Sequence, residues 1–170
     1  MAASLRLRPL REQDEGEALA AHEELRSDSF SFLLGWDPAM RWRDYVELCT
    51  ARSHGRRLAE RWVPSTFLVA EVEGLIVGRA SVRHRLNEFL LHEGGHIGYA
   101  VRPAHRRRGY GSEILRQALV LARAHGVGDV LLTCDVPNTA SAAVIERLGG
   151  VLEDVRDGAD GVPKRRYWIR

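Results

Sequence analysis

"VRPAHRRRGYGSEIL", residues 101 to 115, decides how this 170-residue chain folds. The short apolar run that leads into it stops at Pro103, which cannot donate a hydrogen bond to a β ladder. An arginine-rich loop containing Gly109 and Gly111 follows and opens directly into an amphipathic helix. The free N–H groups and dipole of a helix start attract anions, and glycine lets a ligand approach the backbone closely. The stretch therefore predicts a strand, a pyrophosphate-sized anion site and a helix.

The flanking residues supply the remaining elements. After the helix at 111–126, a nearly continuous apolar run at 129–134 predicts a covered strand, and 138–150 predicts a short helix that Asn138 begins. Because these strands surround two helices in a β-α-β-α-β run, we expect an α/β (α+β) fold with a mixed sheet and helices on both faces. The other predicted elements are strands at 5–10, 65–86 (a hairpin turning at Glu73-Gly74), 95–101, 151–155 and 165–170, and helices at 11–25 and 39–54.

Composition limits the function classes. Hydrophobic residues make up 45% and charged residues 28%, an ordinary soluble balance, and the length fits one domain over 1–170. The net charge of +2 gives no global attraction to nucleic acid or membrane. Two cysteines, Cys49 and Cys134, supply neither a disulfide framework nor a ligand cluster. With no apolar signal segment and no stretch of membrane-spanning length, we expect a cytoplasmic protein.

"HEGGH", residues 92 to 96, matches the H-E-x-x-H signature of zinc peptidases through His92, Glu93 and His96. That signature needs a helix to bring both histidines to one ion, and Gly94 and Gly95 each disfavour a helix by about 1 kcal/mol. The residues that follow read as a strand, in which the two histidines would lie about 13 Å apart. We therefore expect a turn entering a strand, with no metal, and a zinc peptidase is the least favoured alternative.

The stretch Arg106-x-x-Gly109-x-Gly111 resembles the Q/R-x-x-G-x-G/A motif of the GNAT superfamily of N-acetyltransferases. "GYAV" precedes it as that family's fourth strand does, and "LLTCDVPNTASAAVIERLGG" follows as its fifth strand and fourth helix do. The order of elements is similar over nearly the whole chain, and "RHRLNEFLLHEGGHIGY" resembles a bacterial branch of predicted acetyltransferases. The resemblance implies a mostly antiparallel sheet of about six to seven strands, helices on both faces, and a central β-α-β-α-β core that binds acetyl-CoA.

In that family the loop amides hold the pyrophosphate of acetyl-CoA, the acyl donor. The family's fourth and fifth strands splay apart, and pantetheine lies in the gap, where it pairs with the fourth strand. Asn138 matches a position that contacts the cofactor arm, and it also suits a helix N-cap. The resemblance thus assigns cofactor binding to Tyr99, Ala100, Val101, Arg106, Arg107, Arg108, Gly109, Tyr110, Gly111, Ser112 and Asn138.

The sequence indicates the catalytic acid and base less clearly than it indicates the cofactor site. Ser141 matches the serine of one GNAT subgroup, whose hydroxyl is proposed to protonate the departing thiolate, although it also reads as a first-turn helix serine. Many members carry a tyrosine four residues later, where this chain has Ile145. We therefore name Ser141 as the candidate acid.

No base stands at the family's usual positions, which fall at Gly95 and Ile97. Side chains alternate along a strand, so His96 points away from the face of Ile97, on which the family pattern would place the acceptor. His96 is then expected to be a packed, hydrogen-bonded histidine. We rank His84 first as base, because an ordinary histidine titrates near pH 6.5, Glu93 second and a water chain third.

These observations predict an N-acetyltransferase that moves the acetyl group of acetyl-CoA directly to an amine, on a small molecule or a protein. The alternative is a module that binds small anions or nucleic acid through the basic loop at 105–111. The acceptor amine is the expected partner, with no membrane and no nucleic acid, and a homodimer stays open. A cluster of aromatic residues could line the entrance for the acceptor, or it could belong to the core: Phe30, Phe32, Trp36, Trp42 and Tyr45. Three nearby acidic residues could attract a cationic amine there: Asp28, Asp37 and Asp44.

Overall fold

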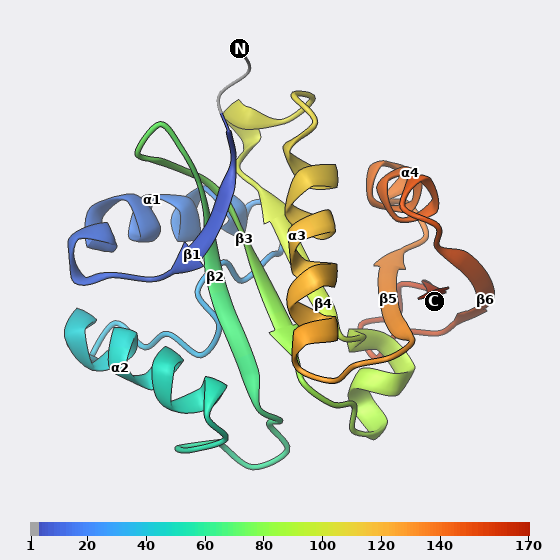
Figure 1. Ribbon diagram of the computed structural model, residues 1–170, viewed down its shortest axis with the longest axis horizontal. Helices are drawn as coiled ribbons and strands as arrows, with labels where there is room; N and C mark the ends of the chain where they lie inside the picture. The colour runs from blue at the N-terminus through green and yellow to red at the C-terminus, as the bar shows by residue number, and fades with distance from the viewer. Residues whose placement is uncertain (1–3) are drawn as a thin grey trace.

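The computed structural model describes residues 4–170; the predicted domain span 1–170 also includes residues 1–3, which lie outside the described residues. The elements follow the predicted order along the chain (Figure 1). They are β1 (Arg6–Pro9), α1 (Glu15–Arg26), α2 (Trp42–Ser53), β2 (Ser65–Val72), β3 (Leu75–Arg83), β4 (Ile97–Val101), α3 (Tyr110–Ala124), β5 (Val130–Asp135), α4 (Thr139–Arg147), β6 (Val151–Arg156) and β7 (Lys164–Ile169), with short turns η1 (Glu12–Asp14), η2 (Leu90–Gly94) and η3 (Pro103–His105).

The seven strands form two antiparallel sheets, one ordered β1-β2-β3-β4 and the other β5-β7-β6. Their junction lies between β4 and β5, where the backbone N–H of His96 donates to Leu131 O at 2.8 Å. The His96 ring accepts a return hydrogen bond from Leu131 N to Nδ1 at 2.9 Å. Beyond this junction β4 pairs with β3, and β5 pairs with β7. The α+β class and the strand number are confirmed, and β4 and β5 separate as the family resemblance implies, which divides the strands into two sheets.

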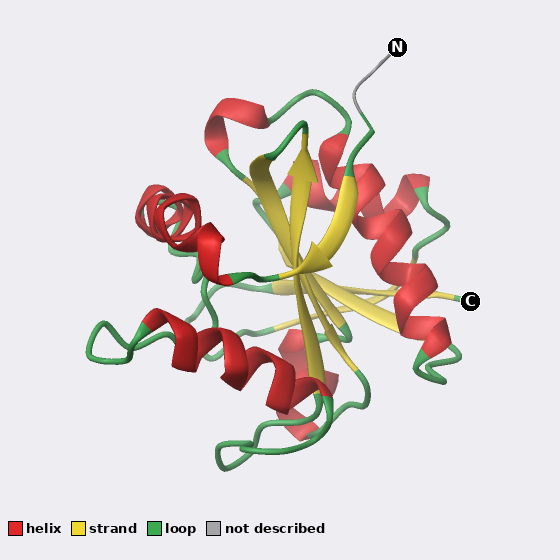
Figure 2. Cartoon of the chain, turned by 60° about the vertical axis from the view of Figure 1, so that its left-hand side comes forward, coloured by secondary structure: helices red, strands yellow, loops and turns green. Residues whose placement is uncertain are grey.

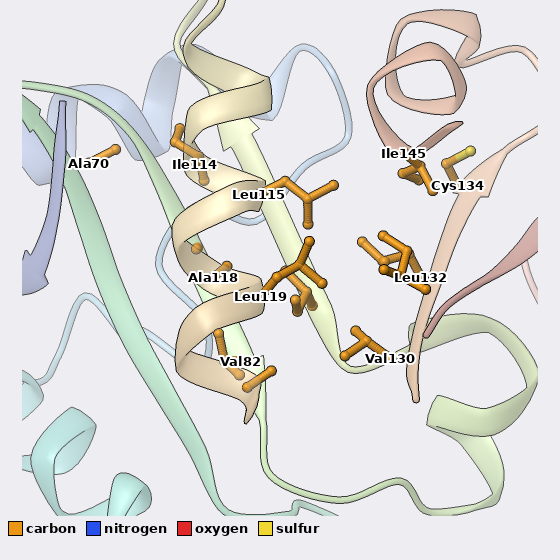
Figure 3. Packing of buried hydrophobic residues seen from close by; sticks show 14 of the residues in the cluster. Ala70, Val82, Ile114, Leu115, Ala118, Leu119, Val130, Leu132, Cys134 and Ile145 are labelled. Carbon is orange, nitrogen blue, oxygen red and sulfur yellow. The ribbon is translucent and has the colours of Figure 1, made fainter. Parts of the chain in front are cut away.

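Helix α3 packs against the division between the sheets. Its predicted apolar stripe is confirmed, because Ile114, Leu115 and Ala118 are fully buried. Figure 3 shows Leu115 and Leu119 pointing across toward side chains of β5 and α4. Full burial of one such side chain contributes about 1.5–3 kcal/mol to stability. This shared core holds the two sheets together on the α3 side.

Helices α1 and α2 pack on the opposite face of the first sheet, so that helices flank the strands on both sides (Figure 2). Their core contains Phe32, Trp42 and Tyr45, which are 0 to 6% exposed. Trp36 packs edge-on against Tyr45, with ring centroids 5.2 Å apart. The aromatic residues considered for an acceptor entrance are therefore mainly core. No helix within residues 4–170 has the length and apolar character needed to cross a membrane.

Candidate active site

The outer edge of β4 is the first component of the site. Hydrogen bonds from Arg83 N to His96 O (2.7 Å) and from Arg102 N to Val77 O (2.8 Å) fix which β4 backbone groups face β3. Because these groups alternate in direction along an antiparallel ladder, every second residue between them faces the other way. The backbone groups that point away from β3, toward the second sheet, belong to Ile97, Tyr99 and Val101.

This alternation separates the three residues predicted to pair with pantetheine. Tyr99 and Val101 present their backbone groups to the division between the sheets, whereas Ala100 pairs with Arg79 of β3. The carbonyl of Val101 already accepts a hydrogen bond from Arg106 Nε at 3.1 Å. A strand-like ligand in this place would therefore meet Tyr99 as its main backbone partner.

The start of α3 forms the second component. Gly109 is its N-cap, with φ +80°, and the preceding Arg107 also has positive φ, +63°. The N–H groups of Tyr110, Gly111 and Ser112 begin the helix and have no acceptor within it. A Cβ at Gly109 would meet no atom within 4 Å, so the surface above this glycine is open. The start of α3 thus has the free N–H groups and the open surface that the predicted anion site requires, and the helix begins one residue earlier than expected.

The three loop arginines have different surroundings. Arg106 forms an ion pair with Asp28 at the end of α1, in addition to its bond to Val101 O. Arg107 and Arg108 are exposed, and neither forms an ion pair within residues 4–170. Arg106 thus fastens the loop to the body of the protein, and the charge left for a phosphate comes from Arg107 and Arg108.

A pair of hydroxyl groups spans the division between the sheets. Tyr99 Oη and Ser141 Oγ lie 3.0 Å apart, joining β4 to the first turn of α4. A Cβ at Gly111 would stand 3.8 Å from the Tyr99 ring and 3.9 Å from Val144, so these side chains surround the start of α3. Burial raises the pKa of Tyr99 to about 12, which keeps its hydroxyl protonated near neutral pH. The family resemblance predicts a role for the backbone of Tyr99 only.

Asn138 caps α4, as one of its two interpretations predicted. Its Oδ1 accepts a hydrogen bond from Ser141 N at 3.1 Å. The same contact fixes the backbone of Ser141 beside Tyr99. Asn138 is exposed, so its amide nitrogen faces solvent near the start of the helix. Its contact with the cofactor arm stays a prediction.

His84 lies away from these residues. Its ring stacks on His125, with centroids 3.7 Å apart, and its Nε2 is 2.8 Å from Thr66 Oγ1. His125 follows the C-terminal end of α3, about 22 Å along the helix from the anion loop. Burial and the neighbouring His125 lower the pKa of His84. The structure therefore does not bring the first-ranked base together with the other site residues.

Glu93 lies on the face of β5 opposite α3. Its carbonyl accepts a hydrogen bond from Thr133 Oγ1 at 2.7 Å, and Thr133 alternates with Leu132 and Cys134, which pack in the α3 core. The Glu93 carboxylate accepts from Ala159 N at 3.1 Å, in the loop between β6 and β7. Of the two base candidates, Glu93 alone lies close to the junction of the sheets on this side.

The "HEGGH" segment forms a π-helical turn, η2, followed by Gly95 with φ +66° and then β4. His92 Nε2 lies 2.8 Å from Asp157 O, whereas His96 is 7% exposed and bonded to Leu131. The predictions of a turn entering a strand and of a packed His96 are confirmed. Across residues 4–170, no three or more His, Cys, Asp and Glu side chains are grouped closely enough to hold a metal ion.

The face of β4 that carries Ile97 and Tyr99 leaves little room for an acceptor. Ile97 is 2% exposed, and both side chains pack in the core around α3. The family pattern implies an acceptor on this face, and this packing argues against that expectation. Gly98 lies on the opposite side of β4.

Comparisons with known proteins agree with this arrangement. Residues 16–150 match the Acetyltransferase (GNAT) family. No curated protein shows significant sequence similarity to the chain. Among solved structures, the chain is similar to Mycobacterium smegmatis RimJ in complex with a CoA-disulfide, with 20% identity, TM-score 0.74 and coverage of 99% of this chain and 82% of that one.

Two further structures have the same fold. A GNAT-family acetyltransferase from Streptococcus pneumoniae has 19% identity and TM-score 0.70, with 98% of each chain covered. RimL, a ribosomal L7/L12 α-N-protein acetyltransferase in complex with coenzyme A, has 18% identity and TM-score 0.68, covering 99% of this chain and 94% of that one. With the family match spanning most of the sequence, the chain belongs to the GNAT family of acetyl-CoA-dependent N-acetyltransferases.

Proposed function

We propose that the protein transfers the acetyl group of acetyl-CoA to an amine that approaches β4 from the side of Gly98. The observation that carries this proposal is the unpaired backbone edge of β4 at Tyr99, which faces the second sheet beside the free start of α3. Pantetheine would add to that edge as an extra strand, as peptides add to exposed sheet edges. The pyrophosphate would lie on the N–H groups of Tyr110, Gly111 and Ser112, near Arg107 and Arg108.

The chain's own groups supply the chemistry of transfer. An alkyl amine has a pKa of about 10.4 and arrives protonated, so it must lose a proton before it attacks. The amine nitrogen then bonds to the thioester carbonyl carbon, and backbone N–H groups stabilise the oxyanion. As the C–S bond breaks, the new amide nitrogen gives its remaining extra proton to water, and Ser141 donates its hydroxyl proton to the thiolate. Ser141 regains a proton through Tyr99, which is reprotonated from solvent.

We propose Glu93, acting through water, as the acceptor of the amine proton. Glu93 lies on the face of β5 opposite α3, close to the junction between the sheets that Gly98 also adjoins. This position supports Glu93 over His84 as the base. His84 faces α3 and stacks on His125 instead. The choice between these residues stays a prediction that rate measurements decide.

We further propose that residues 1–170 act as a single acetyltransferase domain in the cytoplasm. The family match over 16–150 and the two sheets sharing one core around α3 support the single domain. Cys49 and Cys134 are free and buried on separate elements, which suits a reducing compartment.

The test combines binding with turnover. Purified protein is heated with increasing acetyl-CoA, and CoA release is then followed with a panel of amines. We expect the melting temperature to rise with acetyl-CoA by mass action, and CoA release to require an amine. Absence of both the thermal shift and amine-dependent CoA release would contradict the proposed function.

A further inference from the structure

Two arginines lie beneath the side of β4 that we assign to the acceptor. Arg79 of β3 is 2% exposed, and it donates to Gly98 O at 3.2 Å and to Ser31 O at 2.7 Å. The Phe30 ring covers its guanidinium, with 4.4 Å from Cζ to the ring centroid. Its Nε is buried without a hydrogen-bond partner among the described residues. Arg79 therefore keeps a buried positive charge that its neighbours do not fully satisfy.

Arg83 lies four residues further along β3 and points to the same face. Its Nη1 donates to Gly94 O at 3.1 Å, and its Nη2 forms no hydrogen bond within residues 4–170. In the same part of the chain, no carboxylate lies within 4.0 Å of either guanidinium. Burying charges without a counterion is costly, and this cost is reduced when an anion binds beside them.

The two guanidiniums lie close to the backbone of Gly98. The position that a Cβ would occupy at Gly98 lies 3.2 and 3.4 Å from Arg83 Nη1 and Nη2, and 3.6 Å from Arg79 Nη1. Any side chain at residue 98 would therefore press against Arg83, so glycine allows this placement of the guanidinium. Gly98 and Arg83 are both partly exposed, so solvent reaches the Arg83 end of the pair.

We propose that the acceptor is a small amine that also carries a carboxylate, as an amino acid does, and that the solvent-reached Arg83, with Arg79 beneath it, binds this carboxylate beside Gly98. This inference rests on the proposed acetyl transfer. Arg83 makes the direct contact, since its free Nη2 and its planar fork suit a carboxylate, and Arg79 adds charge beneath. Gly98 adjoins Tyr99, where the cofactor edge lies, so a carboxylate held here keeps a nearby amine at that edge.

The acidic residues that could have attracted a cation are engaged elsewhere. Asp28 pairs with Arg106, and Asp44 accepts two hydrogen bonds from Arg41, at 2.8 and 3.0 Å. Asp37 accepts a hydrogen bond from Ala39 N at 2.9 Å, within its own turn. The charge on this side of β4 therefore favours an anionic group on the acceptor over a polycation.

The experiment compares the twenty amino acids with their carboxamides. Each is mixed with acetyl-CoA to measure kcat/KM, and with CoA-saturated protein to measure the thermal shift. We expect at least one amino acid to exceed its carboxamide by about tenfold or more in kcat/KM or affinity, the factor for one charge-assisted hydrogen bond. Diamines without a carboxylate should react no better than the carboxamides.

Three variants test whether the preference for a carboxylate depends on these residues. Arg83→Gln should remove the preference for the carboxylate and leave the acetyl-CoA thermal shift intact. The control is Arg85→Gln, which removes an exposed arginine nearby and should keep the preference. Gly98→Ala keeps both charges but puts a methyl group against the Arg83 guanidinium, and by displacing that guanidinium it should raise KM for the amino acid.

The outcomes separate this inference from the proposed function. If acetyl-CoA binds but no amino acid exceeds its carboxamide in binding or turnover, the inference is overturned while acetyl transfer stands. The same holds if the preference survives in folded Arg83→Gln and Gly98→Ala proteins. Loss of both acetyl-CoA binding and all amine-dependent CoA release would instead reject the proposed function.

Discussion

The two sides of β4 differ in how they form a site. On the α3 side the site consists mainly of backbone groups, at the edge of Tyr99 and at the helix start after Gly109. On the opposite side it consists of side chains, Arg79 and Arg83, that reach a glycine on the neighbouring strand. A site built from backbone groups requires glycines at fixed spacing, so it can be recognised in the sequence as a motif. A site built from side chains on separate strands has no local sequence pattern. Related enzymes can therefore diverge on that side of β4.

The largest effect is expected from breaking the backbone site. Gly109→Val places a β-branched residue at φ +80°, which costs about 1–3 kcal/mol of strain, and puts its side chain where the pyrophosphate would approach. We expect the acetyl-CoA thermal shift to disappear. Gly126→Val is the matched control, because Gly126 has φ +82° and an equally open Cβ position at the other end of α3. It should lower stability similarly and keep the shift; loss of the shift in both variants would refute the assignment.

The next largest effect is expected from the hydroxyl pair of Tyr99 and Ser141. Ser141→Ala and Tyr99→Phe should each lower kcat by about 10²-fold, the usual contribution of a positioned proton donor, with the acetyl-CoA thermal shift kept. Tyr167→Phe serves as control, since it removes another buried tyrosine hydroxyl, bonded to Glu146 at 2.8 Å. If kcat falls equally in the control, the loss reflects packing and not proton transfer.

A smaller effect is expected from the base. Glu93→Gln should lower kcat/KM by about tenfold, whereas His84→Gln should leave kcat/KM unchanged. Both variants are measured with a working acceptor and compared with the unmodified protein. A tenfold loss in His84→Gln, with no loss in Glu93→Gln, would restore the original ranking.

The smallest effect is expected from His96, at the junction between the two sheets, and it should concern stability alone. Burial and the nearby Arg83 lower the pKa of His96, whose Nδ1 accepts from Leu131 N. The unfolded state therefore binds a proton more readily, so the contribution of His96 is complete above about pH 6.5 and is lost as pH falls below it. Urea unfolding at several pH values should give a slope of up to about 1.4 kcal/mol per pH unit from this residue. In His96→Asn the slope should be shallower, and an unchanged slope would contradict the assignment.

The sequence predicted much of the α3 side. The stripe of Ile114 and Ala118, the glycines of the loop and the Asn138 cap each follow from local rules and were found in place. The separation of β4 from β5 was expected only from the family resemblance, because local sequence patterns do not determine which strands pair. Likewise, Tyr99 reaches Ser141 only through the placement of α4.

The opposite side was predicted poorly for a similar reason. Arg79 and Arg83 alternate with apolar residues in "GRASVRHRL", and this spacing could have indicated a charged face on β3. What it could not indicate is that Gly98 lies between them on the next strand. His84 was ranked first from its ordinary pKa alone, and its partner His125 is 41 positions away in the sequence. Contacts between residues that are far apart in the sequence cannot be predicted from the local spacing of residue types.

The most direct test of the central claim is the change in backbone amide NMR signals when acetyl-CoA is added to the labelled protein. We predict large shifts at Tyr99, Val101 and the first residues of α3, Tyr110 to Ser112, because these N–H groups would contact the cofactor. The signals of His84 and His125, at the far end of α3, should stay in place. Saturable binding that moves His84 and His125, but leaves Tyr99 and the start of α3 unchanged, would contradict the account.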